Sequence, residues 1–91
     1  MIETIVRIEN ELGLHARAAA RLVRLTGKFE SDIKFSRLNS QQQVDGKSIL
    51  GILLLAAGLG TEIQMLVQGE DEREASEAVQ TLFREKFGEE K

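Results

Sequence analysis

His15 is the only histidine in the chain, and it directly precedes a run of residues with helical periodicity. The first turn of a helix has unpaired backbone N–H groups, and together with the helix dipole they attract anions. Here these groups belong to Ala16, Arg17 and Ala18, and the guanidinium of Arg17 adds further donors. A neutral imidazole at this position can attack a phosphoryl group and carry it as phosphohistidine. The alternative is that His15 is a surface residue or a weak helix cap.

A stripe of basic side chains follows His15 on the same predicted helix, residues 16–28. Its cations recur at i, i+4, i+7 and i+11, which places them on one solvent-facing stripe. They are Arg17, Arg21, Arg24 and Lys28. The opposite face has the i, i+3, i+4, i+7 spacing of a buried helix face, and Gly27 is a typical stop signal. That buried face comprises Ala19, Leu22, Val23 and Thr26. Most charged helix faces are only solvated, but a purely basic stripe is less ordinary in a chain of net charge −3.

Two segments carry a resemblance to a known family. Gly-Leu-His-Ala-Arg at residues 13–17 is followed by Gly-Lys-Ser-Ile-Leu-Gly-Ile-Leu at residues 46–53. Together with weaker similarities at residues 28–33, 60–63 and 69–72, they resemble the HPr family, the histidine-containing phosphocarrier proteins of the bacterial phosphotransferase system. The similarity extends over nearly the whole chain.

The resemblance implies a carrier that partner enzymes phosphorylate transiently, and not an enzyme. HPr proteins take a phosphoryl group from enzyme I, itself charged by phosphoenolpyruvate, and pass it to a downstream EIIA-type acceptor in a sugar or regulatory branch. By this resemblance, the phosphate is carried on Nδ1 of His15, with assistance from Arg17. The family usually has proline after the arginine, whereas this chain has Ala18 and no proline. Because alanine keeps the helix and adds a free donor, we expect the His15 chemistry to survive in a less rigid site.

Ser48 is the second residue with two interpretations. It precedes a short apolar run and is well placed as a helix N-cap, a role worth about 1 kcal/mol. It also matches the serine that a dedicated kinase, HPr kinase/phosphorylase, phosphorylates in some bacteria, which impedes phosphate transfer to the histidine. A phosphate is locally tolerated at a helix N-terminus, so we expect any such effect to arise from repulsion of acidic partners. The sequence favours the N-cap as the main role.

The aliphatic residues after Ser48 predict an exposed apolar patch. So many aliphatic side chains in a short helix cannot all point inward, and exposed apolar patches mark contact surfaces. The expected members are Ile49, Leu50 and Leu53. The resemblance assigns this helix and the first one to a single docking face, with Ala20 between them and the basic stripe at its rim, where it steers acidic partners. The alternative is that the loop up to residue 60 folds over these side chains.

Hydrophobic patterning predicts one domain, residues 1–91, with the element order βαββαβα. Residues 2–9 alternate as a strand with one buried face, residues 32–37 and 41–45 form a hairpin, and residues 62–68 form the fourth strand. The last helix begins after Asp71, which forms a capping-box-like start with Glu74. We therefore expect an α+β open-faced sandwich, in which three helices cover one face of a four-stranded antiparallel sheet. Only residues 88–91 are expected to fray.

Composition excludes several classes of protein. The chain has no cysteine and one histidine, so we expect no disulfide, no metal and no cofactor. The net charge is negative and no aromatic residue is interleaved with the basic stripe, which argues against nucleic-acid binding. The longest mostly apolar run, residues 49–60, falls short of the ~20 residues of a membrane span. Charges near the N-terminus argue against a signal peptide, so we expect a cytoplasmic protein, and we expect a monomer.

Three functions compete for this pattern. A phosphocarrier would use His15 as the transient nucleophile. An HPr-like regulatory interaction module would use the same face without carrying phosphate on His15, but modules of that kind tend to lack the histidine, which this chain retains. An enzyme acting alone is disfavoured, because the sequence shows no acid partner for the one histidine. The sequence therefore favours the phosphocarrier.

Overall fold

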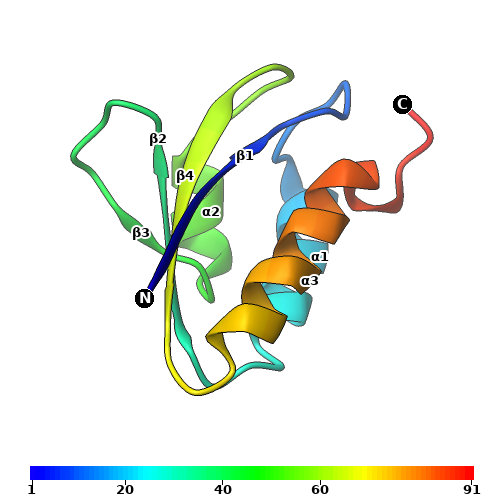
Figure 1. Cartoon of the computed structure of the whole chain (residues 1–91). Helices are drawn as coiled ribbons and strands as arrows, with labels where there is room; N and C mark the ends of the chain where they lie inside the picture. The colour runs from blue at the N-terminus through cyan, green and yellow to red at the C-terminus, as the bar shows by residue number, and fades with distance from the viewer.

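The computed structural model describes residues 1–91 and has the predicted order of elements. These elements are β1 (Ile2–Arg7), α1 (Ala16–Thr26), β2 (Asp32–Arg37), β3 (Val44–Asp45), α2 (Ile49–Leu54), β4 (Glu62–Gln68), α3 (Glu72–Arg84) and a final 3-10 turn, η1 (Lys86–Gly88). The βαββαβα prediction is therefore confirmed, with η1 as an unpredicted addition (Figure 1). None of the helices is both long and apolar enough to cross a membrane.

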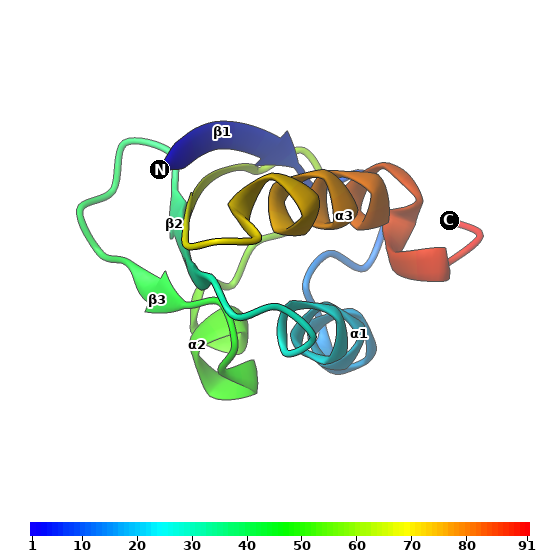
Figure 2. The same ribbon diagram turned by 60° about the horizontal axis from the view of Figure 1, so that its bottom comes forward.

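The strands form one antiparallel sheet in the order β1-β4-β2-β3. The register places Val6 opposite Ile63 and Phe35 opposite Met65, so the inward side chains of neighbouring strands share one face. All three helices lie on that face: α3 contacts β1, α2 contacts β3, and α1 contacts both other helices (Figure 2). This arrangement confirms the α+β open-faced sandwich.

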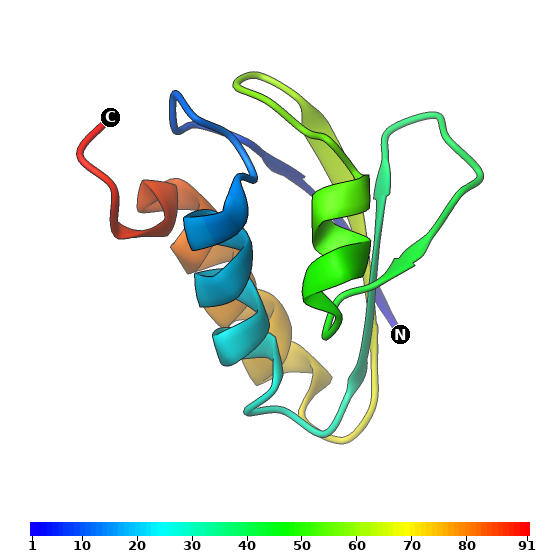
Figure 3. The same ribbon diagram turned by 180° about the vertical axis from the view of Figure 1, so that it is seen from behind.

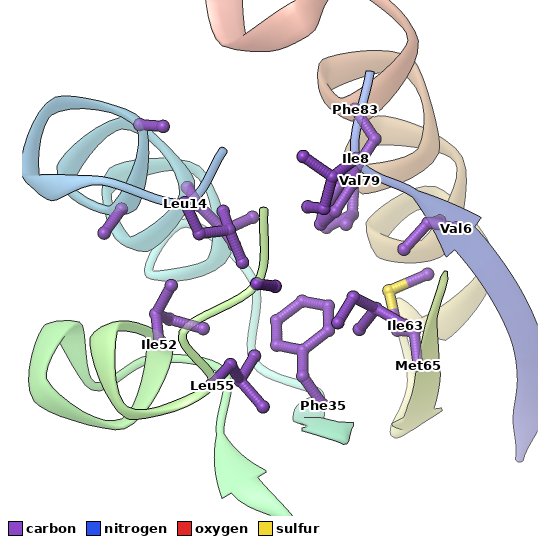
Figure 4. Packing of buried hydrophobic residues seen from close by; sticks show 14 of the residues in the cluster. Val6, Ile8, Leu14, Phe35, Ile52, Leu55, Ile63, Met65, Val79 and Phe83 are labelled. Carbon is purple, nitrogen blue, oxygen red and sulfur yellow. The ribbon is translucent and has the colours of Figure 1, made fainter. Parts of the chain in front are cut away.

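The core lies between the sheet and the helices. Phe35 from β2 and Ile63 from β4 face Ile52 from α2 and Phe83 from α3, and each of these side chains is almost completely buried (Figure 4). The predicted buried face of α1 is confirmed at Ala19, Leu22 and Thr26, while Val23 is half-buried. Burial of this kind contributes about 1.5–3 kcal/mol for each large apolar side chain, so the packed sheet gives α1 and α2 a rigid support.

Three predicted boundaries are wrong. The first strand ends at Arg7 and not at residue 9, and Ile8 exchanges hydrogen bonds with the loop residues Gly60 and Thr61. The second strand of the hairpin is only β3, because residues 41–43 are exposed glutamines without the apolar alternation that would bury one face. The first helix ends at Thr26, where the Oγ1 atom donates to the carbonyl of Gly46 at 2.8 Å. Lys28 therefore lies beyond the helix, on the link to β2.

Asp71 precedes α3, but its side chain makes no hydrogen bond to that helix, so the predicted capping box is wrong. The carboxylate instead accepts from the backbone N–H of Glu30 at 2.9 Å, and from the N–H and Oγ of Ser31 at 3.0 and 2.5 Å. The hydroxyl of Ser31 and the N–H of Glu30 hold the pKa of Asp71 below its ordinary value. Asp71 therefore fastens the link between α1 and β2 to the start of α3.

Candidate functional site

His15 occupies the N-cap position of α1. Its backbone is extended, with φ −76° and ψ −180°, and its carbonyl accepts the N–H of Ala19 at 2.8 Å. The imidazole makes no capping hydrogen bond, and the N–H groups of residues 16–18 donate to no backbone carbonyl. The structure therefore places an imidazole that does not cap the helix beside three unpaired donors of an eleven-residue helix.

The loop before His15 is fixed by its contacts with the loop after α2. Gly13 has φ +68°, and the N–H of Leu14 donates to the carbonyl of Ala57 at 2.9 Å. Leu14 is buried, and the side-chain amide of Asn10 donates back to the carbonyl of Gly13 at 2.9 Å. These contacts set the direction in which the chain enters α1.

The imidazole of His15 pairs with a carboxylate from the other end of the chain. Its Nε2 lies 2.5 Å from Oε2 of Glu89, and the other oxygen of Glu89 accepts from Nδ2 of Asn10 at 2.9 Å. The side chain of His15 is 27% exposed and that of Glu89 only 10%. Burial raises the pKa of Glu89, but hydrogen bonds from Asn10 and His15 and nearby positive charge, that of Arg17 included, outweigh it, so the pKa lies below its ordinary value. Glu89 is therefore held as a carboxylate against the ring.

No local pattern in the sequence singles out Glu89, and the prediction that residues 88–91 fray is wrong. Phe87 is buried with φ +57° and Gly88 has φ +80°, so the chain turns back sharply after α3. Arg21 then holds the carbonyl of Phe87 at 2.5 Å, and the N–H of Glu11 donates to the carbonyl of Lys91 at 2.7 Å. The C-terminal segment consequently runs beside the loop that precedes α1 (Figure 3).

The predicted basic stripe is only partly free. Arg17, Arg24 and Lys28 are exposed, but the guanidinium of Arg21 is half-buried against Phe87. Arg17 and Arg21 also line a hollow of the surface beside residues 88–91. Arg17 is therefore the main cation available to an incoming anion near His15.

Ser48 is the N-cap of α2, as predicted, and its Oγ accepts the N–H of Gly51 at 3.1 Å. The predicted apolar patch is exposed: Leu50 is 67% accessible, and Ile49 and Leu53 are accessible to lesser extents. Leu54 is also exposed, which the sequence did not single out. The loop up to residue 60 therefore does not cover these side chains. Because α1 and α2 lie side by side with half-buried Ala20 on α1, the patch and His15 belong to the same side of the molecule (Figure 3).

Comparison with known proteins places this arrangement in a family. The family model described as "PTS HPr component phosphorylation site" matches residues 2–85. The chain belongs to the HPr family. The phosphocarrier protein HPr of Cupriavidus necator is 46% identical over 89 residues, which cover 98% of each chain. HPr proteins are phosphocarriers of the phosphotransferase system, so the phosphocarrier class is established for this chain as well.

Solved HPr structures have the same fold as this HPr-family chain. The crystal structure of HPr-C-His from Thermoanaerobacter tengcongensis covers 100% of both chains with a TM-score of 0.92 and 41% identity. A second structure from the same organism is described as an HPr dimer; it covers 98% of this chain and 100% of its own, with a TM-score of 0.76 and 40% identity.

The absence of the usual proline does not disturb the start of α1. Ala18 is fully buried, and the helix nevertheless begins at Ala16. Proline in the first helical turn would remove an N–H that has no partner inside the helix. With alanine, the N–H of residue 18 stays available beside the ring of His15.

Proposed function

We propose that this HPr-family protein accepts a phosphoryl group from phosphorylated enzyme I on Nδ1 of His15 and passes it to a downstream EIIA-type protein. One observation carries the proposal: the ring of His15 stands at the unpaired N-terminus of α1, with Nε2 already bound by Glu89 and Nδ1 left for reaction. The protein turns over nothing by itself, because donor and acceptor enzymes supply the chemistry at each end of the transfer.

The transfer is a simple exchange of bonds. The lone pair of Nδ1 attacks phosphorus, and the bond from phosphorus to the donor breaks with its electron pair returning to the donor. The phosphoryl oxygens then lie near the N–H groups of Ala16, Arg17 and Ala18 and the guanidinium of Arg17. These donors are aimed before the reaction begins, so they stabilise the charge of the transferred group without reorganising. The same steps in reverse deliver the group to the acceptor.

Docking of both partners is assigned to the side of the molecule that carries α1 and α2. The apolar residues Ile49, Leu50 and Leu53, with Ala20 beside them, would exclude water around the imidazole. The exposed cations Arg24 and Lys28 would steer an acidic partner, whereas half-buried Arg21 would help hold the C-terminal segment in place.

Ser48 is proposed as the regulatory site, with HPr kinase/phosphorylase as the partner that would modify it. Its hydroxyl accepts the N–H of Gly51, and the residue is half-buried at the start of the apolar patch. A phosphate there would retain favourable contact with the start of α2 and would oppose an acidic partner. Regulation would therefore act on docking and not on folding.

The decisive experiment is intact mass measurement after incubation with phosphoenolpyruvate and enzyme I from the same organism. A gain of one phosphate that is lost in acid, and that is absent from His15→Ala, supports the carrier function. Unfolding of the His15→Ala variant is measured alongside, because loss of the ring also removes the partner of Glu89, and the variant must stay folded under the assay conditions. No gain with an enzyme I of proven activity would favour the regulatory interaction module instead.

The remaining expectations stay predictions. We expect a monomer in the cytoplasm, and the dimeric Thermoanaerobacter structure makes oligomeric state a property to measure for this chain. Light scattering of the purified protein, with and without enzyme I, addresses it directly.

A further inference from the structure

Glu89 is in a position to control which ring nitrogen of His15 reacts. Its Oε2 lies 2.5 Å from Nε2, and its pKa lies below its ordinary value, so it is an acceptor and Nε2 must be the donor of this bond. In a neutral imidazole, a proton on Nε2 leaves the lone pair on Nδ1. We propose that Glu89 is the positioning residue that fixes His15 as the Nε2–H tautomer and turns Nδ1 toward the incoming phosphoryl group.

The carboxylate is itself held in place, as such a role requires. Asn10 donates to Oε1 of Glu89 at 2.9 Å and to the carbonyl of Gly13 at 2.9 Å, which ties the carboxylate to the loop that carries His15. Asn10 is fully buried, and Phe87 anchors the segment on the other side. Residues 87–91 therefore act as a strap that presents one carboxylate to one ring nitrogen.

The pairing also assists the reaction itself. When Nδ1 forms its bond to phosphorus, the proton stays on Nε2 and positive charge develops on the ring. The carboxylate of Glu89 then faces a positively charged ring. Because the side chain of Glu89 is only 10% exposed, their charge-assisted hydrogen bond is stronger than it would be in water. When the phosphoryl group leaves, its bonding pair returns to Nδ1 and the ring becomes neutral again. No proton has to enter or leave during either step.

This inference rests on the proposed carrier function but can fail separately from it. The test is Glu89→Gln, which keeps the size of the side chain and removes its charge, with Glu90→Gln as the matched control. Glu90 is the exposed neighbour, and its carboxylate makes no hydrogen bond or ion pair. Nitrogen-15 NMR of the His15 ring reports the tautomer, and the rate of phosphorylation by enzyme I reports the reaction.

The wild type and Glu90→Gln should show a single Nε2–H signal that is protected from exchange with solvent. In Glu89→Gln the amide oxygen still accepts from Nε2 but carries no charge, so this protection should be reduced and the phosphorylation rate should fall about tenfold, because a charge-assisted hydrogen bond is stronger than a neutral one. Glu89→Asp, which keeps the charge on a shorter side chain, should recover part of the rate.

Two results would overturn the inference. In one, the Nε2–H signal and the rate of Glu89→Gln match those of Glu90→Gln. In the other, the rate falls while the exchange protection of the Nε2–H signal equals that of the wild type, which would assign Glu89 to partner docking and not to the ring. If His15→Ala still accepts phosphate, the carrier function itself fails, whatever the Glu89 variants do.

Discussion

A Cβ atom at Gly13 would lie 2.5 Å from the carbonyl oxygen of Ala57. It would also lie 2.8 Å from the Cα of Gly58, and residue 13 has φ +68°, a conformation that L side chains rarely adopt. The loop before His15 and the loop after α2 therefore approach closely only because residue 13 is a glycine. This contact links the ring of His15 to the element that carries the apolar patch.

We expect Gly13→Ala to lower the free energy of unfolding by about 1–3 kcal/mol, because it adds backbone strain and a clash with backbone atoms that cannot move alone. It should also slow phosphate acceptance although His15 is unchanged, since the loop that aims the ring must shift. Urea unfolding and the rate of phosphorylation measure the two effects. Gly58→Ala is the control in the same contact, because a Cβ there meets nothing within 4 Å. Equal behaviour of the two variants would contradict the prediction.

Asp71 should make stability depend on pH in the acid range. A carboxyl whose pKa is lower in the folded than in the unfolded protein stabilises the fold when ionised. Its contribution is complete above the unfolded pKa, near 4, and is lost as the pH falls through the folded pKa. Asp71→Asn should therefore lower the melting temperature at pH 7, because an amide offers one acceptor oxygen where three hydrogen bonds now end.

The control for Asp71 is Glu74→Gln, which removes an exposed carboxylate from the first turn of the same helix. Circular dichroism melts at pH 7 and at successively lower pH should show the Asp71→Asn difference narrowing once the pH falls below the unfolded pKa, and closing when the carboxyl is protonated in the folded protein as well. Glu74→Gln should show a smaller change at pH 7. A deficit of Asp71→Asn that persists unchanged in acid would mean that the charge of Asp71 is not the source of its effect.

The sequence predicted what depends on local pattern. The order of elements, β2, β4 and the start of α1 follow from periodicity and cap residues within one segment. The features that the sequence did not predict depend on contacts between segments that are far apart in the chain. Glu89 is separated from His15 by 74 residues, and the positive φ angles of Lys86, Phe87 and Gly88 bring it back. The side chain of Asp71 likewise accepts hydrogen bonds from Glu30 and Ser31, which lie 41 and 40 positions earlier in the chain, and no capping pattern anticipates these bonds.

The same limit explains the basic stripe. Helical spacing correctly placed Arg17, Arg21 and Arg24 on one face of α1. It could not show that Arg21 donates to the backbone carbonyl of Phe87, whose side chain is buried, and that this cation is therefore not free at the surface. The stripe is therefore not uniform: Arg21 binds the C-terminal segment, whereas Arg17 and Arg24 face solvent.

Two variants of Ser48 can distinguish its role in folding from its proposed role in regulation. Ser48→Ala removes the hydrogen bond to the N–H of Gly51 and should cost about 1 kcal/mol of stability, with little effect on phosphate acceptance at His15. Ser48→Asp keeps an acceptor at the N-cap and adds charge, so it should stay within about 0.5 kcal/mol of the wild type and slow phosphorylation by enzyme I. Urea unfolding and phosphorylation rates compare the two. A slowing that is equal in both variants would assign the effect to the cap and not to the charge.

The exposed residues of α2 should matter for partners and not for folding. Leu50 is 67% exposed, so Leu50→Ala should change the free energy of unfolding by less than about 0.5 kcal/mol. If the patch is the centre of a docking surface, the same change should raise the KM for enzyme I about tenfold and leave kcat nearly unaltered, because the ring of His15 is untouched. The control is Ile5→Ala: Ile5 is 51% exposed and points away from the helices, on the open face of the sheet. A KM that rises equally in both variants would show that loss of exposed apolar surface in general, and not this patch, weakens the complex.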